Sequence, residues 1–139
     1  MNETTATPVP ARKKIFVVDD EPDFTSLLKR ALESTGEFEV QTENIPSLAL
    51  NAALKFNPDL LLLDVIMPGI DGGTLEARLK SVPALKHKPV IFLTATISPR
   101  EAGKSGLASA GNIFLAKPVD LDTLVNRINS MLAQSSASA

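Results

Sequence analysis

The sequence contains no cysteine, no tryptophan and a single histidine among its 139 residues. Without thiols there can be no disulfide framework, no thiolate zinc site, no iron–sulfur cluster and no cysteine nucleophile. One histidine, His87, cannot build a multi-histidine metal cage. Any metal chemistry of this chain therefore has to rest on oxygen ligands.

A strong excess of charge of one sign is also missing. Lysine and arginine number 14 against 16 aspartates and glutamates, which gives a formal net charge of −2. Domains whose main partner is a phosphate backbone usually carry a basic face. Direct binding of nucleic acid is therefore not expected.

Long apolar runs are absent as well. Runs such as 60–63 (LLLL) fall far short of the about 20 apolar residues that a membrane-spanning helix needs. The N-terminus lacks the basic and apolar blocks of a signal peptide. We expect a soluble, cytoplasmic protein with no membrane partner.

The length of the chain is that of one ordinary domain. Its two ends are rich in Thr, Pro, Ser and Ala and hold few large apolar side chains, so they cannot offset the entropy of becoming ordered. We predict a disordered N-terminal arm at 1–11, a single domain at 12–133 and a flexible C-terminal tail at 134–139.

Short apolar runs predict the strands of this domain. Four runs have no polar interruption, as in strands of a parallel sheet that is buried on both faces: 15–18, 60–63, 90–93 and 113–116. The segment 38–42 (FEVQT) alternates apolar and polar residues instead. That alternation predicts an edge strand covered on one side only.

Segments with helical periodicity lie between these runs. The clearest is an apolar stripe at 24–32, with Pro22 at its start and Gly36 after its end, and a second stripe at 121–132 follows Asp120 as N-cap. Weaker patterns predict helices at 49–56, 75–79 and 99–108. The apolar side chains of the stripes are expected in the core.

The order of elements is therefore β-α repeated five times. Right-handed crossovers through helices build a parallel sheet covered on both faces. We predict a single doubly wound (βα)5 α/β domain with a flavodoxin-like, five-stranded parallel sheet. Ligands of such sheets bind beyond the carboxyl ends of the strands.

The residues at these strand ends carry the functional information. They are Asp19 and Asp20 after the first run, Asp64 after 60–63, Thr94 after 90–93 and Lys117 after 113–116. Taken singly, each is explained as a turn, cap or surface residue. Three carboxylates at one edge, however, repel and raise one another's pKa unless a cation joins them.

A hard divalent cation suits such a site. Carboxylates with water are the ligand set of Mg²⁺, with Mn²⁺ as the alternative ion. A metal held this way usually works on a phosphoryl group, which Lys117 could neutralise and Thr94 could hydrogen-bond. Asp64, in the middle of the set, is then the candidate nucleophile.

Four segments resemble the receiver domain of bacterial two-component response regulators: 16–23 (FVVDDEPD), 58–72 (PDLLLLDVIMPGIDG), 92–95 (FLTA) and 114–120 (FLAKPVD). The resemblance covers nearly all of the predicted domain. It implies a phosphorylation-dependent switch rather than an enzyme with a separate substrate. It also implies a histidine kinase or phosphotransfer protein as the phosphoryl donor.

The resemblance further implies a role for each matching residue. Asp64 accepts the phosphoryl group, and Asp19, Asp20, Asp64 and the backbone carbonyl of Ile66 hold Mg²⁺. Lys117 pairs with the phosphoryl group, in a Lys117–Pro118 peptide that is a candidate for the cis form. Thr94 and Phe114 form the switch.

The resemblance also extends to the signalling surface and to the phosphorylated state. The fourth helix, fifth strand and fifth helix would carry the signal to an unknown downstream protein, and homodimerisation is an alternative use of that surface. Phe114 stands where the family often has Tyr, so no hydroxyl is offered to a partner. Neither Ile66 nor Thr96 carries a base or an amide that would position a water for attack, which predicts a long-lived phosphorylated state.

Three alternatives remain. A receiver fold that has lost its chemistry would act as a silent scaffold. A phosphoaspartate-type phosphatase of the haloacid dehalogenase class would carry D-x-D after its first strand, whereas Asp19 and Asp20 are adjacent. A flavodoxin-like cofactor module would need a Ser/Thr/Gly-rich phosphate loop, where this chain has 19–23 (DDEPD).

Overall fold

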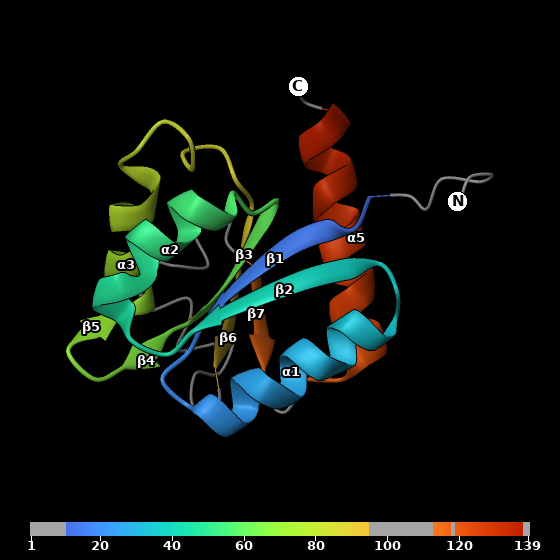
Figure 1. Cartoon of the computed structure of the whole chain (residues 1–139), viewed down its shortest axis with the longest axis horizontal. Coiled ribbons are helices and arrows are strands. Elements are labelled where there is room, and N and C mark those ends of the chain that lie inside the picture. Colours follow the sequence, from blue (N-terminus) through green and yellow to red (C-terminus); the bar gives the residue numbers. More distant parts are fainter. Residues whose placement is uncertain (1–10, 95–112, 118, 138–139) are drawn as a thin grey trace, which may run out of the picture.

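The computed structural model describes residues 11–94, 113–117 and 119–137. Strands and helices alternate along the chain (Figure 1). The strands are β1 (Lys13–Val18), β2 (Phe38–Glu43), β3 (Leu60–Asp64), β4 (Ile66–Met67), β5 (Ile70–Asp71), β6 (Val90–Thr94) and β7 (Ile113–Ala116). The helices are α1 (Pro22–Ser34), α2 (Ala49–Phe56), α3 (Gly72–Lys80) and α5 (Leu121–Ala137), and a 3-10 turn, η2 (Pro46–Leu48), precedes α2. The helix predicted at 99–108 lies outside the described residues.

Five strands form one parallel sheet in the order β2-β1-β3-β6-β7. The chain passes from β1 outward to β2, returns past β1 to β3 and continues to β6 and β7, so its winding reverses between β1 and β3. This is the predicted doubly wound fold. Because ligands of such sheets bind at the reversal, the carboxyl ends of β1 and β3 mark the place to look for a site.

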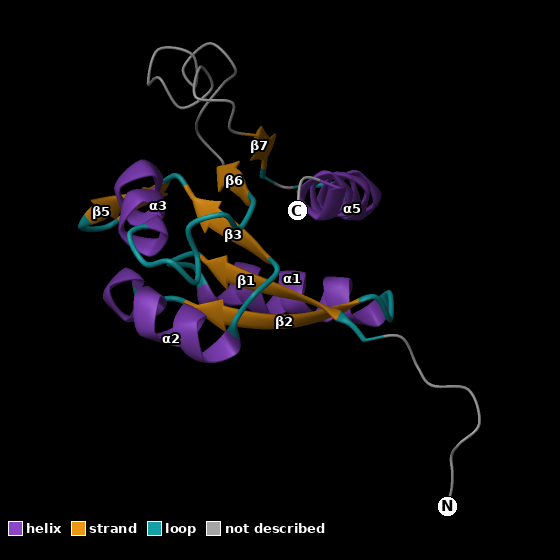
Figure 2. Ribbon diagram, turned by 90° about the horizontal axis from the view of Figure 1, so that it is seen from above, coloured by secondary structure: helices purple, strands orange, loops and turns teal. Residues whose placement is uncertain are grey.

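Helices cover both faces of the sheet (Figure 2). On one face α2 and α3 pack on alternate strand residues such as Phe16, Leu61 and Phe92. On the other face α1 and α5 pack on the intervening residues, among them Val17 and Leu62. The runs on β1, β3 and β6 are uninterrupted because successive side chains enter opposite cores, and both cores exclude water.

The two edge strands differ from the central ones in burial. On β2, Phe38 and Val40 are buried while Glu39 is exposed, which confirms the alternation expected of an edge. The residues 113–115 on β7 are half-buried, so the prediction that this strand is buried on both faces was wrong. The physical reason is its place at the second edge of the sheet, where it has one neighbouring strand.

The start and end of α1 follow the sequence signals, whereas the burial of Leu27 and the end of the last helix differ from the predictions. Pro22 stands in the first turn of α1, and Gly36, with a φ of 82°, follows its end. Leu27, expected in the core, is 63% exposed because it lies at the solvent side of the α1 stripe. The last helix continues to Ala137, so the boundary between domain and tail, predicted after 133, falls within α5.

Side chains of α1 form hydrogen bonds with the backbone at the outer edge of β2. Lys29 Nζ donates to the carbonyl oxygen of Val40 at 2.6 Å, and the Val40 N–H donates to Glu33 Oε2 at 3.0 Å. Lys29 and Glu33 also pair with each other across one helical turn. The Val40 hydrogen bond, together with the charge of Lys29, lowers the pKa of Glu33 below its usual value.

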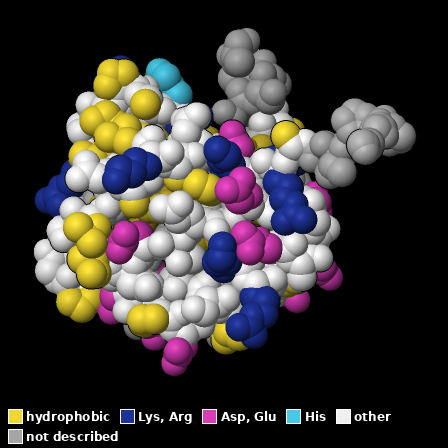
Figure 3. All heavy atoms as spheres, viewed as in Figure 1, with side chains coloured by type: hydrophobic (Ala, Val, Ile, Leu, Met, Phe, Trp, Pro, Cys, Tyr) yellow, Lys and Arg dark blue, Asp and Glu magenta, His cyan; other side chains and the backbone are white. Residues whose placement is uncertain are grey.

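Charges of both signs intermingle on the face drawn in Figure 3, in keeping with the nearly balanced composition. Among the described residues, none of the helices has the length and apolar character required to cross a membrane.

Candidate functional site

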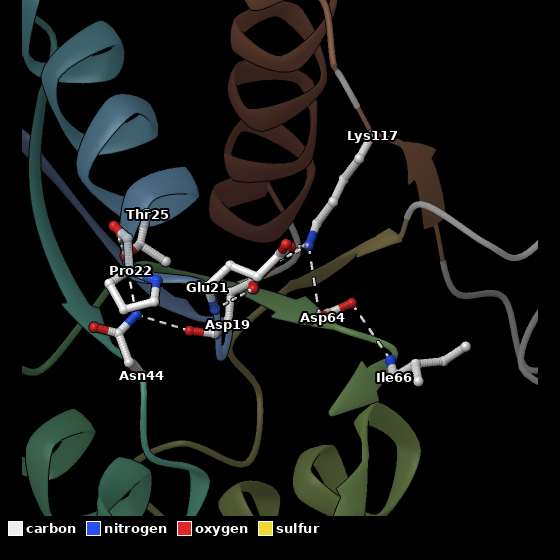
Figure 4. Close-up of polar contacts among 8 residues, drawn as sticks. All are labelled: Asp19, Glu21, Pro22, Thr25, Asn44, Asp64, Ile66 and Lys117. Carbon is white, nitrogen blue, oxygen red and sulfur yellow. Dashed lines mark hydrogen bonds and ion pairs between the residues drawn. The ribbon is translucent and has the colours of Figure 1, made fainter. Parts of the chain in front are cut away.

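The sheet brings the predicted residues to its carboxyl edge. Asp19 directly follows β1, Asp64 ends β3, Thr94 ends β6 and Lys117 directly follows β7. Parallel strands in register end side by side, so residues far apart in the chain meet there. Figure 4 shows Lys117 reaching from the end of β7 toward Asp19 and Asp64.

Three carboxylates form an acidic cluster at this edge. Oxygen atoms of Asp19, Asp20 and Asp64 all lie within 4.8 Å of one another. Asp19 is 1% exposed and Asp64 is 5% exposed, whereas Asp20 is half-buried. Two carboxylates of the cluster are therefore buried, and the third, that of Asp20, is partly accessible to solvent.

Burial raises the pKa of Asp64 to about 6, and the neighbouring charge of Asp19 adds to the increase. Lys117 and the Ile66 N–H, which faces Asp64 Oδ1 at 3.4 Å, act in the opposite direction without cancelling it. At neutral pH Asp64 is ionised but poorly solvated. A carboxylate in this state is available as a nucleophile and as a cation ligand.

Lys117 provides a positive charge next to the acidic cluster. Its ammonium forms ion pairs with Asp19, with Glu21 Oε1 at 3.1 Å and with Asp64 Oδ2 at 3.6 Å. It also lies 4.4 Å from the centroid of the Phe24 ring. Burial works toward a lower pKa, but Asp19, Asp64 and Glu21 outweigh it and raise the pKa of Lys117, which keeps the amine charged.

A network that the sequence analysis missed holds the loop after β1. Asn44 Nδ2, at the end of β2, donates to the backbone oxygen of Asp19 at 2.8 Å and to Thr25 Oγ1 at 3.0 Å. Thr25, which is 1% exposed, donates in turn to the backbone oxygen of Pro22 at 3.1 Å. Asn44 follows a strand end as the other site residues do, and that placement was the signal available.

Glu21 is the second residue that was missed. Its backbone N–H donates to Asp19 Oδ1 at 3.0 Å, and its side chain reaches Lys117. The two partners are 96 residues apart in the chain, so local sequence patterns could not pair them.

The switch candidates occupy the expected strands. Thr94 is 2% exposed at the end of β6, and its backbone oxygen accepts a hydrogen bond from the Lys117 N–H at 2.9 Å. The ring of Phe114 on β7 stacks on Phe92, with centroids 5.2 Å apart and planes inclined by 20°. Pro118 lies outside the described residues, and so does the cis peptide expected between Lys117 and Pro118. Thr96, one of the two residues expected to set the lifetime of the phosphorylated state, also lies outside them.

The donor set fits a hard divalent cation. All three clustered side chains offer carboxylate oxygens and none offers sulfur or nitrogen. Asp19 Oδ2 is buried and accepts no hydrogen bond within the described part of the chain, where its partner is the Lys117 ammonium. Three nearby carboxylates against one ammonium leave a local excess of negative charge that a dication would neutralise.

The raised pKa of Asp64 predicts an effect on stability. Because the folded pKa of about 6 exceeds the ordinary 3.8, folding favours the protonated carboxyl, and stability falls as the pH rises through this range. Replacing Asp64 by asparagine removes the buried charge. We expect the free energy of unfolding at pH 7.5 to rise by about 2 kcal/mol, as measured by urea denaturation in EDTA.

The pH dependence provides the internal control for this stability prediction. Below about pH 4 the wild-type carboxyl is protonated and resembles the amide, so the gain of Asp64→Asn should disappear. Asp122→Asn, at the start of α5, makes the same substitution outside the acidic cluster and should change stability little at either pH. If Asp64→Asn raised the free energy of unfolding equally at pH 4 and pH 7.5, the buried charge of Asp64 could not be the cause.

Comparison with known proteins identifies the family. The family model of the response regulator receiver domain matches residues 15–129. The response regulator PleD of Caulobacter vibrioides is 40% identical over 119 residues, which cover 85% of this chain and 26% of that protein. The transcriptional regulatory protein TrcR of Mycobacterium tuberculosis is 33% identical over 123 residues, 88% of this chain and 46% of that protein.

A solved structure agrees with the fold. The chemotaxis protein CheY4 of Vibrio cholerae superimposes with a TM-score of 0.76 at 28% identity, over 86% of this chain and 98% of that one. This chain spans from about a quarter to about half of the length of PleD and TrcR. The similarity therefore concerns one domain, and the chain belongs to the family of response regulator receiver domains.

Proposed function

We propose that this receiver domain accepts a phosphoryl group on Asp64 from a phosphohistidine of a histidine kinase or phosphotransfer protein. The observation that carries the proposal is the arrangement at the carboxyl edge of the sheet. There a buried, ionised carboxylate lies between two further carboxylates and an ammonium group. Membership in the receiver family supports the same chemistry.

The transfer forms one bond and breaks one. A carboxylate oxygen of Asp64 attacks the phosphorus, and the P–N bond of the phosphohistidine breaks. The electron pair of that bond leaves with the imidazole nitrogen, and the proton carried by the other ring nitrogen of the phosphohistidine makes the departing imidazole neutral. The product is an acyl phosphate on Asp64, and Lys117, whose Nζ lies 3.6 Å from Asp64 Oδ2, would compensate the charge on the phosphoryl oxygens.

The proposed cofactor is Mg²⁺, with Mn²⁺ as the alternative. Asp19, Asp20, Asp64 and the backbone carbonyl of Ile66 would hold it. When bound, the ion supplies charge neutralisation for the incoming phosphoryl group. Asn44 and Thr25 keep Asp19 in position for this role through the hydrogen bonds of the β1–α1 loop.

The phosphoryl group would act as a signal through Thr94 and Phe114. Thr94 ends the strand next to β3 and would move to hydrogen-bond a phosphoryl oxygen on Asp64. We propose that this movement repositions Phe114, whose ring stacks on Phe92. The surface of the helix expected at 99–108, β7 and α5 would then bind a downstream protein or a second copy of the domain.

The first experiment measures the intact mass of the protein after incubation with acetyl phosphate. With Mg²⁺ present we expect a gain of one phosphoryl group per chain, and with EDTA we expect none. Beryllofluoride, which mimics the phosphoryl group, should shift the amide resonances of Thr94 and Phe114. A folded chain that binds Mg²⁺ but shows neither response would refute the proposal.

That negative outcome would favour the silent scaffold, since the fold would persist without the chemistry. The phosphatase alternative predicts catalytic turnover of a phosphorylated substrate by the unmodified chain, with release of inorganic phosphate in large excess over protein. A single, saturable mass gain distinguishes the proposed switch from such an enzyme.

A further inference from the structure

Glu21 occupies a position where its side chain has an unusual partner. It is the N-cap residue of α1, yet its side chain makes no capping hydrogen bond to that helix. Instead Glu21 Oε1 accepts a hydrogen bond from Lys117 Nζ at 3.1 Å (Figure 4). The carboxylate thus binds the group that is expected to pair with the phosphoryl oxygens.

The ammonium of Lys117 has three N–H donors to share. Asp19 and Glu21 are close enough to engage two of them, and Asp64 lies farther away at 3.6 Å. The Phe24 ring contributes a further attraction at 4.4 Å. A phosphoryl group on Asp64 would therefore have to compete for the ammonium with contacts that already exist.

Of these contacts, the one with Glu21 is the adjustable one. Asp19 is buried in the acidic cluster, and its carboxylate cannot leave without exposing an uncompensated site. The Glu21 side chain is 62% exposed and can rotate into water, whereas the Lys117 side chain is only 8% exposed. An exposed partner of a buried ammonium can act as a releasable restraint.

We infer that Glu21 restrains Lys117 in the unphosphorylated domain and thereby slows phosphorylation of Asp64. This inference rests on the proposed function and assigns to Glu21 the role of a positioning residue that acts through Lys117. Because exposed ion pairs contribute little energy each, the effect of removing this carboxylate is small but measurable.

The test compares Glu21→Gln with wild type. We expect phosphorylation by acetyl phosphate to become about two- to five-fold faster and beryllofluoride affinity to increase by a similar factor. A merely structural role of Glu21 predicts a loss instead of a gain. An unchanged or slower rate in Glu21→Gln, with a wild type that incorporates phosphoryl normally, overturns the inference.

Asp23→Asn is the matched control. It makes the same change in charge two residues away, in the first turn of α1, while the described ion pairs of Lys117 are with Asp19, Glu21 and Asp64. If general repulsion of an anionic donor were responsible, both variants would accelerate equally. Equal acceleration therefore also overturns the inference.

A second measurement does not depend on phosphoryl transfer. Reductive methylation at pH 8 followed by peptide mass spectrometry reports how freely the Lys117 amine reacts, with the exposed Lys86 as internal reference. We expect Lys117 to react about two- to five-fold faster in Glu21→Gln, and no increase would refute the restraint. A wild type that takes up no phosphoryl group refutes the proposed function, and the methylation result then still decides whether Glu21 restrains Lys117.

Discussion

Replacing Asp64 by asparagine should abolish phosphoryl incorporation by this domain. The amide keeps the size and shape of the carboxylate but has no anionic oxygen to attack phosphorus. We expect the mass gain with acetyl phosphate and Mg²⁺ to fall by at least about 100-fold, to below detection. Since the same substitution is expected to raise the free energy of unfolding, the expected loss would not arise from unfolding.

Two controls make this loss specific to Asp64. Asp122→Asn, outside the acidic cluster, should incorporate phosphoryl at the wild-type level. Borohydride reduction of the wild-type product converts an aspartyl phosphate to homoserine, so peptide mass spectrometry locates the modified residue. Normal labelling of Asp64→Asn, or homoserine at Asp19 or Asp20 in the wild type, would move the acceptor elsewhere in the cluster.

Replacing Gly72 by alanine should strongly destabilise the fold. Gly72 begins α3, and its N–H donates to the backbone oxygen of Val65 at 2.7 Å. A Cβ atom at this position would lie 2.6 Å from the backbone oxygen of Asp64 and 2.9 Å from Val65 Cα. These are backbone atoms of the segment that ends β3, so no side-chain rotation can relieve the overlap.

We expect Gly72→Ala to lower the free energy of unfolding by about 3 kcal/mol, measured by urea denaturation followed by circular dichroism. The displacement of Asp64 should also slow phosphorylation in the fraction that remains folded. Gly73→Ala, in the next position of the same helix, should be neutral or stabilise by up to about 1 kcal/mol through helix propensity. Equal midpoints for Gly72→Ala and wild type would contradict the close packing of α3 on β3.

The parts of the fold that could be predicted are those determined by local patterns. The central strands β1, β3 and β6 are uninterrupted apolar runs, and α1 begins and ends at Pro22 and Gly36 as expected. The hairpin of β4 and β5 was missed because strands of two residues have no periodicity to detect. The turn of this hairpin contains Pro68 and Gly69, and Gly69 has the positive φ of 83° that such turns favour.

The candidate site was predictable to the extent that it follows strand ends. Asp19, Asp20, Asp64, Thr94 and Lys117 all lie where parallel strands would bring them. The contacts of Lys117 with Glu21 and Phe24, and that of Asn44 with Asp19, depend on how loops fold over the sheet edge. Such pairings join residues 25 to 96 positions apart, and no sequence spacing specifies them.

The hydrogen bonds from α1 to the backbone of Val40 protect the outer edge of β2 from other copies of this domain at high concentration. An exposed edge strand offers unpaired backbone groups on which a strand of another molecule can add, which is a common route to aggregation. On β2, Lys29 and Glu33 occupy both backbone groups of Val40, so an incoming strand would have to displace two charged side chains. Protonation of Glu33 in acid weakens one of these contacts, and the N–H of Val40 then becomes available to an incoming strand.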